Sequence, residues 1–194
     1  MNDFTFYFIW GWHHIISKDA LDHILFIVAL AAIYLAKDWK QVLVLVTAFT
    51  IGHSLTLALS VYDLIRINSA WVEFLIPCTI IITALFNFFQ TDFTKRTLRL
   101  NYFLALFFGL IHGLGFANNI RFMLAKDQQI GWSLFGFNAG LEAGQIVVVA
   151  LILLMGFLVV TTARLNRRWW VWALSGIAFL IAVRLAWQQA NQLF

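Results

Sequence analysis

The chain has 194 residues, of which 62% are hydrophobic and only 11% are charged. A soluble domain carries about a quarter charged residues and less than half apolar ones, so this composition excludes a water-soluble globule and predicts an integral membrane protein. The formal net charge of +4 does not indicate a nucleic-acid partner, because the basic residues fall between apolar runs, where they set membrane topology.

Six apolar stretches are long enough to cross a bilayer, which takes about 20 residues of helix. They lie at 20–36, 41–62, 69–89, 98–118, 135–162 and 169–188. The segment before them, 4–16, is too short to span and is rich in Phe and Trp, so we expect an interfacial or re-entrant helix there. The sequence therefore predicts an all-α integral membrane protein. We expect a single domain, residues 1–194, in which this short N-terminal segment precedes a bundle of six transmembrane helices.

The distribution of Lys and Arg predicts how this bundle is oriented. Eight of these residues lie in the connections after the first, third and fifth spans, and five lie on the opposite side. The positive-inside rule places the first group in the cytoplasm. Both termini are then predicted to lie outside.

Polar side chains interrupt five of the six apolar stretches. Ionisable groups within spans are costly and usually face the bundle interior or a wet cavity, so they are functional candidates. In chain order the candidates are His14, Asp22, His23, His53, Glu73, His112 and Glu142, with the polar neighbours Thr50, Ser54, Asn138 and Gln145. In the predicted orientation, the acidic candidates lie in the first turns of spans that run from the outside to the cytoplasm. His53 and His112 lie past the middle of spans that run from the cytoplasm to the outside. This arrangement predicts one polar layer in the outer half of the membrane.

The fifth span has two distinct faces. At about 100° per residue, Asn138, Glu142 and Gln145 fall within about 60° of one another. The glycines from Gly136 to Gly144 lie on roughly the opposite side. We expect a neighbouring helix to approach this small-residue face closely, and the glycines around His112 to allow the same.

Metal binding is the chemistry that suits several histidines and carboxylates in one layer. Imidazole and carboxylate ligands suit zinc, nickel, cobalt or iron(II), and the single Cys78 excludes a cysteine-rich centre. We interpret His23, His53 and His112 as imidazole ligands of a divalent metal ion. Asp22 and Glu142 would balance its charge, as ligands or as acceptors for imidazole N–H groups.

The remaining polar residues have a structural interpretation beside the functional one. The side chains that could hydrogen-bond to the ligands are Thr50, Ser54, Glu73, Asn138 and Gln145. Hydroxyl groups in helices also bond to their own backbone. Glu73 can simply be a solvated residue at the start of a helix. A lone intramembrane histidine can have a purely structural role, as a hydrogen-bond partner of a neighbouring helix. His13 fits the aromatic belt at the membrane interface.

Four motifs of the chain resemble a known family. The strings HIISKDALDHILFIVAL, FTIGHSLTLAL, GLIHGLGFA and FNAGLEAGQ, in that order, are similar to the HupE/UreJ family of bacterial membrane proteins. The resemblance implies a nickel or cobalt permease linked to hydrogenase and urease maturation, in the bacterial inner (cytoplasmic) membrane. It also implies a polar signature of His14, Asp22, His23, His53, His112 and Glu142, which adds His14 to the candidate ligands.

The residues leave two main functions open, beside a metal sensor, a metal chaperone or a purely structural role. The favoured one is a divalent transition-metal permease or metal-binding membrane protein for nickel, cobalt or zinc. The alternative is an intramembrane zinc-dependent hydrolase acting on a lipid or a membrane-anchored substrate, in which the metal activates water and Glu142 or Asp22 serves as general base. Both functions use the same residues, so the sequence leaves open whether the protein is an enzyme.

Overall fold

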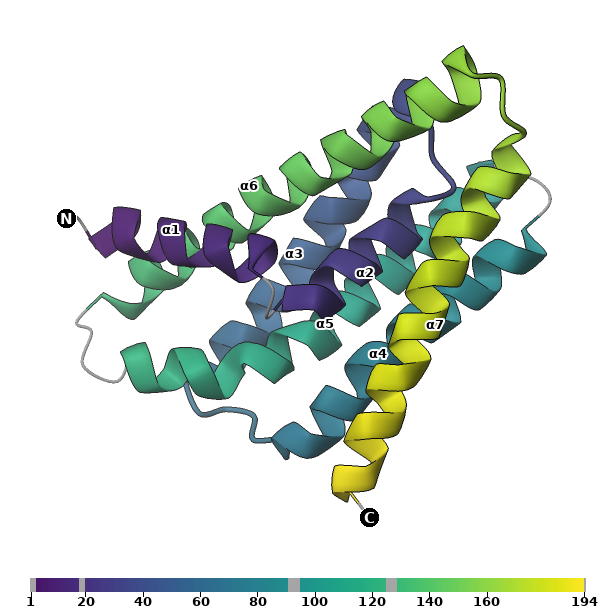
Figure 1. Ribbon diagram of the computed structural model, residues 1–194. Coiled ribbons are helices and arrows are strands. Elements are labelled where there is room, and N and C mark those ends of the chain that lie inside the picture. Colours follow the sequence, from purple (N-terminus) through teal and green to yellow (C-terminus); the bar gives the residue numbers. More distant parts are fainter. Residues whose placement is uncertain (1–2, 18–19, 91–94, 125–128, 194) are drawn as a thin grey trace.

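The computed structural model describes residues 3–17, 20–90, 95–124 and 129–193, and these residues form helices without a strand (Figure 1). In chain order the elements are α1 (Asp3–Ile16), α2 (Leu21–Ala31), the short η2 (Ala36–Asp38), α3 (Trp39–Val61), α4 (Ser69–Phe89), α5 (Lys95–Leu124), α6 (Ile130–Gly156), the π-helical η3 (Phe157–Thr162) and α7 (Arg167–Leu193). The all-helical class that the sequence predicts is confirmed.

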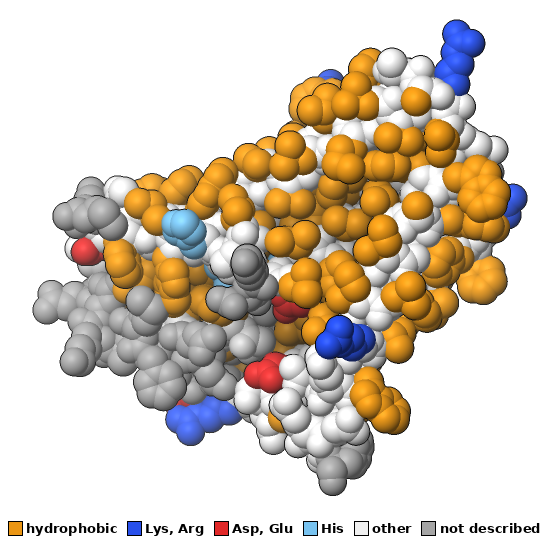
Figure 2. Space-filling model, in the orientation of Figure 1, with side chains coloured by type: hydrophobic (Ala, Val, Ile, Leu, Met, Phe, Trp, Pro, Cys, Tyr) orange, Lys and Arg blue, Asp and Glu red, His pale blue; other side chains and the backbone are white. Residues whose placement is uncertain are grey.

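Five helical segments of the described chain are long and apolar enough to cross a membrane. They cover Ala36–Val61, Ser69–Phe89, Leu100–Ala117, Ile130–Thr162 and Arg167–Leu193, and they correspond to the second to sixth predicted spans. Hydrophobic side chains cover much of the surface in Figure 2. On α7, for example, Leu180 and Trp187 are each 70% exposed, as expected for side chains that face lipid. The protein is therefore a multi-pass membrane protein.

The first predicted span, 20–36, is wrong as a single helix. Helix α2 has only 11 residues, which at about 1.5 Å per residue is roughly half of the hydrocarbon thickness. In the chain that follows it, Arg167 at the start of α7 donates to the backbone oxygen of Ile33. The backbone N–H of Leu35 donates to Asp38 Oδ2 at 3.1 Å. One of these contacts is distant in sequence and the other is local, and both lie just beyond the end of α2.

Helices α1 and α2 together follow the length of α6. At one end, the ring of Phe4 lies 5.5 Å from that of Trp132, near the start of α6. At the other end, Ile33 meets Arg167, just beyond η3. The two short helices run one after the other across the bundle before α3 (Figure 1). The predicted N-terminal segment is thus packed on the bundle, with Tyr7, Gly11 and Ile15 buried.

The small-residue face predicted for the fifth span is confirmed, and α1 is its neighbour. A Cβ atom on Gly140 would overlap the backbone oxygen of Phe8, and one on Gly11 would overlap that of Phe137. The same close approach joins α3 and α5, where a Cβ atom on Gly113 would overlap the backbone oxygen of His53. Glycine is required at these crossings because the backbones touch. The two crossings hold His14 and His53 at fixed positions.

The predicted orientation in the membrane remains a prediction. Several of the basic side chains on which it depends, within 91–99 and 121–128, lie outside the described side chains. The placement of both termini outside, and of the polar layer in the outer half, depends on that orientation.

Candidate metal centre

Four histidines from four helices meet in the interior of the bundle. His23 on α2 lies at their centre, with ring centroids 4.8 Å from His14, 5.0 Å from His112 and 6.0 Å from His53. His53 and His112 are fully buried, and His23 is only 3% exposed. The structure thus brings together the three histidines chosen from the sequence and the one that the family resemblance added.

Two sets of three side chains in this cluster could each hold a metal ion. One set is His14, His23 and His53, and the other is Asp22, His23 and His112. Within each set, one ligand atom per residue lies within 4.8 Å of the others. His23 belongs to both sets, so the two positions overlap.

The ring nitrogens of this cluster fit a cation because several of them have no other partner. Among the described residues, His14 Nε2, His23 Nε2, His112 Nδ1 and both ring nitrogens of His53 are buried without a hydrogen bond. Buried polar groups nearly always have a partner, and an unpaired one costs free energy. A divalent ion would satisfy several of these lone pairs at once, and imidazole nitrogen is among its preferred ligands.

Asp22 orients the central histidine. His23 Nδ1 lies 3.0 Å from Asp22 Oδ1, and the backbone N–H of His23 donates to the same oxygen at 2.8 Å. A carboxylate accepts the Nδ1 proton, which leaves the lone pair on Nε2 for a metal ion. Both bonds use Oδ1, so Oδ2 is available as a ligand in the second set.

Thr79 on α4 fixes the tautomer of His112. The single hydroxyl proton of Thr79 is donated to the backbone oxygen of Ile76 at 2.7 Å. Thr79 Oγ1 must therefore accept from His112 Nε2, which lies 3.1 Å away. The lone pair of neutral His112 is then on Nδ1, the nitrogen that lacks a partner. Thr79 is not among the residues predicted from the sequence, although its hydroxyl in the middle of an apolar helix is a signal that could have identified it.

We expect Thr79→Val to weaken metal binding about 10–100-fold, the usual cost of losing a partner that orients a ligand. The measurement is a titration of the purified protein with Co²⁺, followed by its absorption. Thr83→Val is the matched control, because Thr83 lies one turn further on α4 and donates only to the backbone oxygen of Thr79. Equal losses in both variants would show that Thr79 acts on helix packing and not on His112.

Phenylalanine rings surround the histidines. The His14 ring lies 4.0 Å from Phe116 and 5.7 Å from Phe137, and the His112 ring lies 5.1 Å from Phe49, measured between centroids. Such walls exclude water and lower the local dielectric constant, so charges interact more strongly there than in water. The centre is a small polar site in an apolar surrounding.

The predicted polar face of α6 faces α3. Thr50 Oγ1 donates to Gln145 Oε1 at 2.9 Å, and Thr47 Oγ1 donates to Glu142 Oε1 at 2.7 Å. Among the described residues, Glu142 belongs to neither ligand set. Its predicted role as a ligand therefore remains a prediction.

Asn138 lies at the end of this face that is nearest the histidines. Its side-chain N–H donates to the backbone oxygen of Leu134 at 2.8 Å, and its Oδ1 is buried without a hydrogen bond. Ser54 instead bonds to its own helix, through the backbone oxygen of Thr50 at 2.6 Å. Of these two predicted supporting residues, Asn138 keeps a buried oxygen without a hydrogen bond, whereas the Ser54 hydroxyl is used within its own helix. Their predicted support of the centre remains a prediction.

The fold and this centre define a class, a multi-pass helical membrane protein with a buried histidine and carboxylate site suited to a metal ion. The sequence profile of the HupE/UreJ protein family matches residues 1–190. The chain belongs to this family, as its four motifs predict. Neither a curated protein nor a solved structure shows significant similarity to the chain.

Proposed function

We propose that the protein is a permease for a divalent transition-metal ion, nickel or cobalt, which passes through the histidine cluster as cargo. The observation that carries this proposal is the pair of overlapping ligand sets that share His23. Two adjacent positions with a common ligand allow an ion to move without losing all of its ligands at once. Membership of the HupE/UreJ family supports nickel and cobalt in particular, as the cargo that the family resemblance implies.

The break between the consecutive short helices α1 and α2 supports transport further. Many transporters bind their ions where a helix is broken, because the helix ends and the side chains beside them line a polar site inside the membrane. Here α1 ends at Ile16 and α2 begins at Leu21. His14 comes just before this interruption, and Asp22 and His23 come just after it, so both ligand sets include a residue beside the break.

Transport is tested with purified protein in liposomes. We expect liposomes that contain the protein to take up Ni²⁺ or Co²⁺ faster than empty ones, and His53→Ala/His112→Ala to remove the difference, because this double variant breaks both ligand sets. Uptake is measured by elemental analysis of the washed liposomes. Equal uptake by the double variant and the unmodified protein would refute transport through this cluster.

Zinc-dependent hydrolysis is a second candidate, favoured by the set of three imidazoles, His14, His23 and His53. Three histidine ligands with an open fourth position are typical of catalytic zinc sites. Asp22 is better placed than Glu142 to act as general base, because it belongs to the neighbouring ligand set. Hydrolysis of a lipid or lipopeptide ester that requires Zn²⁺ and is lost in His53→Ala, together with unchanged metal uptake by liposomes, would favour this function over transport.

A further inference from the structure

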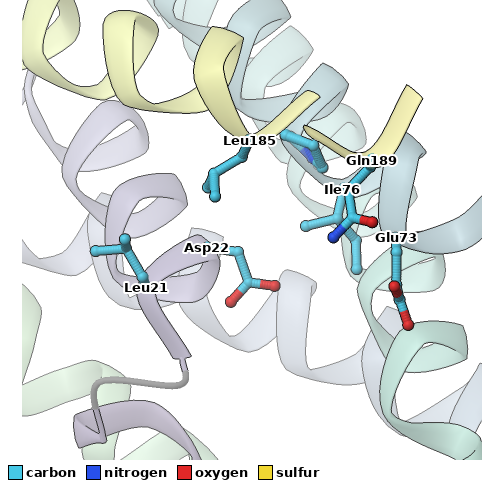
Figure 3. A pocket seen from close by; sticks show the side chains of 7 residues that line it. Leu21, Asp22, Glu73, Ile76, Leu185 and Gln189 are labelled. Atoms are coloured by element: carbon cyan, nitrogen blue, oxygen red, sulfur yellow. The ribbon is translucent and has the colours of Figure 1, made fainter. Parts of the chain in front are cut away.

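A cavity of about 190 Å³ lies between α2, α4 and α7. Figure 3 shows Asp22 on α2 across from Glu73 on α4 and Gln189 on α7. Leu21, Ile76, Pro77 and Leu185 complete the lining. Glu73 is exposed and lies near the start of α4, while Gln189 lies near the end of α7. The cavity therefore reaches the surface at the end of the bundle where α4 begins and α7 ends.

Asp22 connects this cavity to the histidines. Its carboxylate lines the cavity and is 27% exposed, yet Oδ1 accepts from His23, whose side chain is only 4% exposed. His112, in the same ligand set, is fully buried and has an unpartnered Nδ1. A cation that reaches Asp22 from the cavity therefore meets two buried imidazoles directly behind it.

We infer that this cavity is the entrance through which the divalent cation reaches the centre, and that Asp22, His23 and His112 hold the ion first. This inference rests on the proposed function and adds the route and the order of binding. His14 and His53, the histidines of the other set, take the ion afterwards, while His23 remains a ligand throughout.

The lining suits a hydrated cation. Liquid water occupies about 30 Å³ per molecule, so the cavity has room for an ion with several of its waters. Glu73 and Asp22 supply negative charge on opposite walls, and Gln189 supplies an amide oxygen. Carboxylates at an opening raise the local concentration of cations and speed their association. The ion exchanges its waters for Asp22, His23 and His112 as it enters.

The route is tested by closing the cavity with a covalent label. In a Cys78→Ser background, Leu185→Cys is labelled with a bulky maleimide, and the rate of Co²⁺ binding to the purified protein is followed by absorption. We expect the label to slow binding by about tenfold or more, at the low end of the range by which such openings change association rates. Leu180→Cys on the same helix is the matched control, because Leu180 is 70% exposed and lies outside the cavity.

Glu73→Gln tests the same route without a label. We expect slower Co²⁺ binding that depends less on salt, since a charge at the entrance has been removed. Unchanged rates in this variant and in labelled Leu185→Cys would overturn the route. An unmodified protein that binds no Co²⁺ would instead refute the proposed function, so the two failures are distinguishable.

The order of binding is tested with His112→Ala and His14→Ala. We expect His14→Ala to keep a rapid Co²⁺ association that the label at Leu185→Cys still slows, because the set of Asp22, His23 and His112 is complete in this variant. His112→Ala should lose the rapid association. The reverse result would show that the ion reaches His14 and His53 first.

Discussion

His23→Ala is expected to abolish binding of nickel and cobalt, whereas His14→Ala and His112→Ala each leave a weakened site. His23 is the one side chain common to both ligand sets of the described chain, so without it neither set keeps three ligands. The loss should exceed the 10–100-fold that removal of an orienting partner costs. Calorimetric titration with Ni²⁺ and elemental analysis of the purified protein measure it.

His13→Ala is the matched control for this prediction. His13 is exposed, lies next to His14 in sequence and belongs to neither ligand set. We expect its metal content to equal that of the unmodified protein. If His23→Ala bound metal as tightly as His13→Ala, the assignment of the centre to this cluster would be wrong.

Gly140→Val is expected to separate α1 from α6 and to lower both stability and metal affinity. The added side chain would meet the backbone oxygen of Phe8, which cannot move aside as a flexible side chain could. Overpacking of this kind costs about 1–3 kcal/mol or more. Because α1 carries His14, its displacement should also weaken the set of His14, His23 and His53. Thermal unfolding in detergent and Co²⁺ titration measure the two effects.

Gly176→Val on α7 separates close packing from a general effect of losing a glycine. A Cβ atom at Gly176 would have no other atom within 4 Å, apart from its immediate neighbours in the helix. We expect this variant to unfold at the temperature of the unmodified protein or slightly above it, since replacing glycine within a helix is favourable. Equal destabilisation by the two substitutions would contradict the role given to the crossing of α1 and α6.

Much of the centre could be predicted from the sequence because membrane depth is a strong constraint. Residues at the same depth in different spans must lie in one layer, and His23, His53 and His112 indeed meet. Periodicity also separated the glycine face of α6 from its polar face. It could not tell which helix each face would meet, because that depends on the packing of the whole bundle. The polar face of α6 meets α3, where Glu142 accepts a hydrogen bond from Thr47 and belongs to neither ligand set of the described residues.

The early end of α2 could not be predicted from the apolar pattern of the sequence. Residues 20–36 are apolar and long enough for a span, and neither a proline nor a glycine marks an end at Ala31. The contact of Arg167 with the backbone oxygen of Ile33 joins this segment to α7 across more than half of the chain, and such a contact cannot be read from local sequence. The contribution of Thr79 could not be predicted either, because a threonine in a helix most often bonds to its own backbone. Thr79 does so, and its oxygen accepts from His112 as well.

The small number of carboxylates in the cluster has a consequence for how long an ion stays. Asp22 is the only acidic residue in either ligand set of the described chain. A divalent ion held there keeps one uncompensated positive charge among phenylalanine rings, and beside His14 and His53 it keeps two. Uncompensated charge in such surroundings is costly. We therefore expect short dwell times and single occupancy, because a second ion arriving at Asp22 would repel the first and drive it onward.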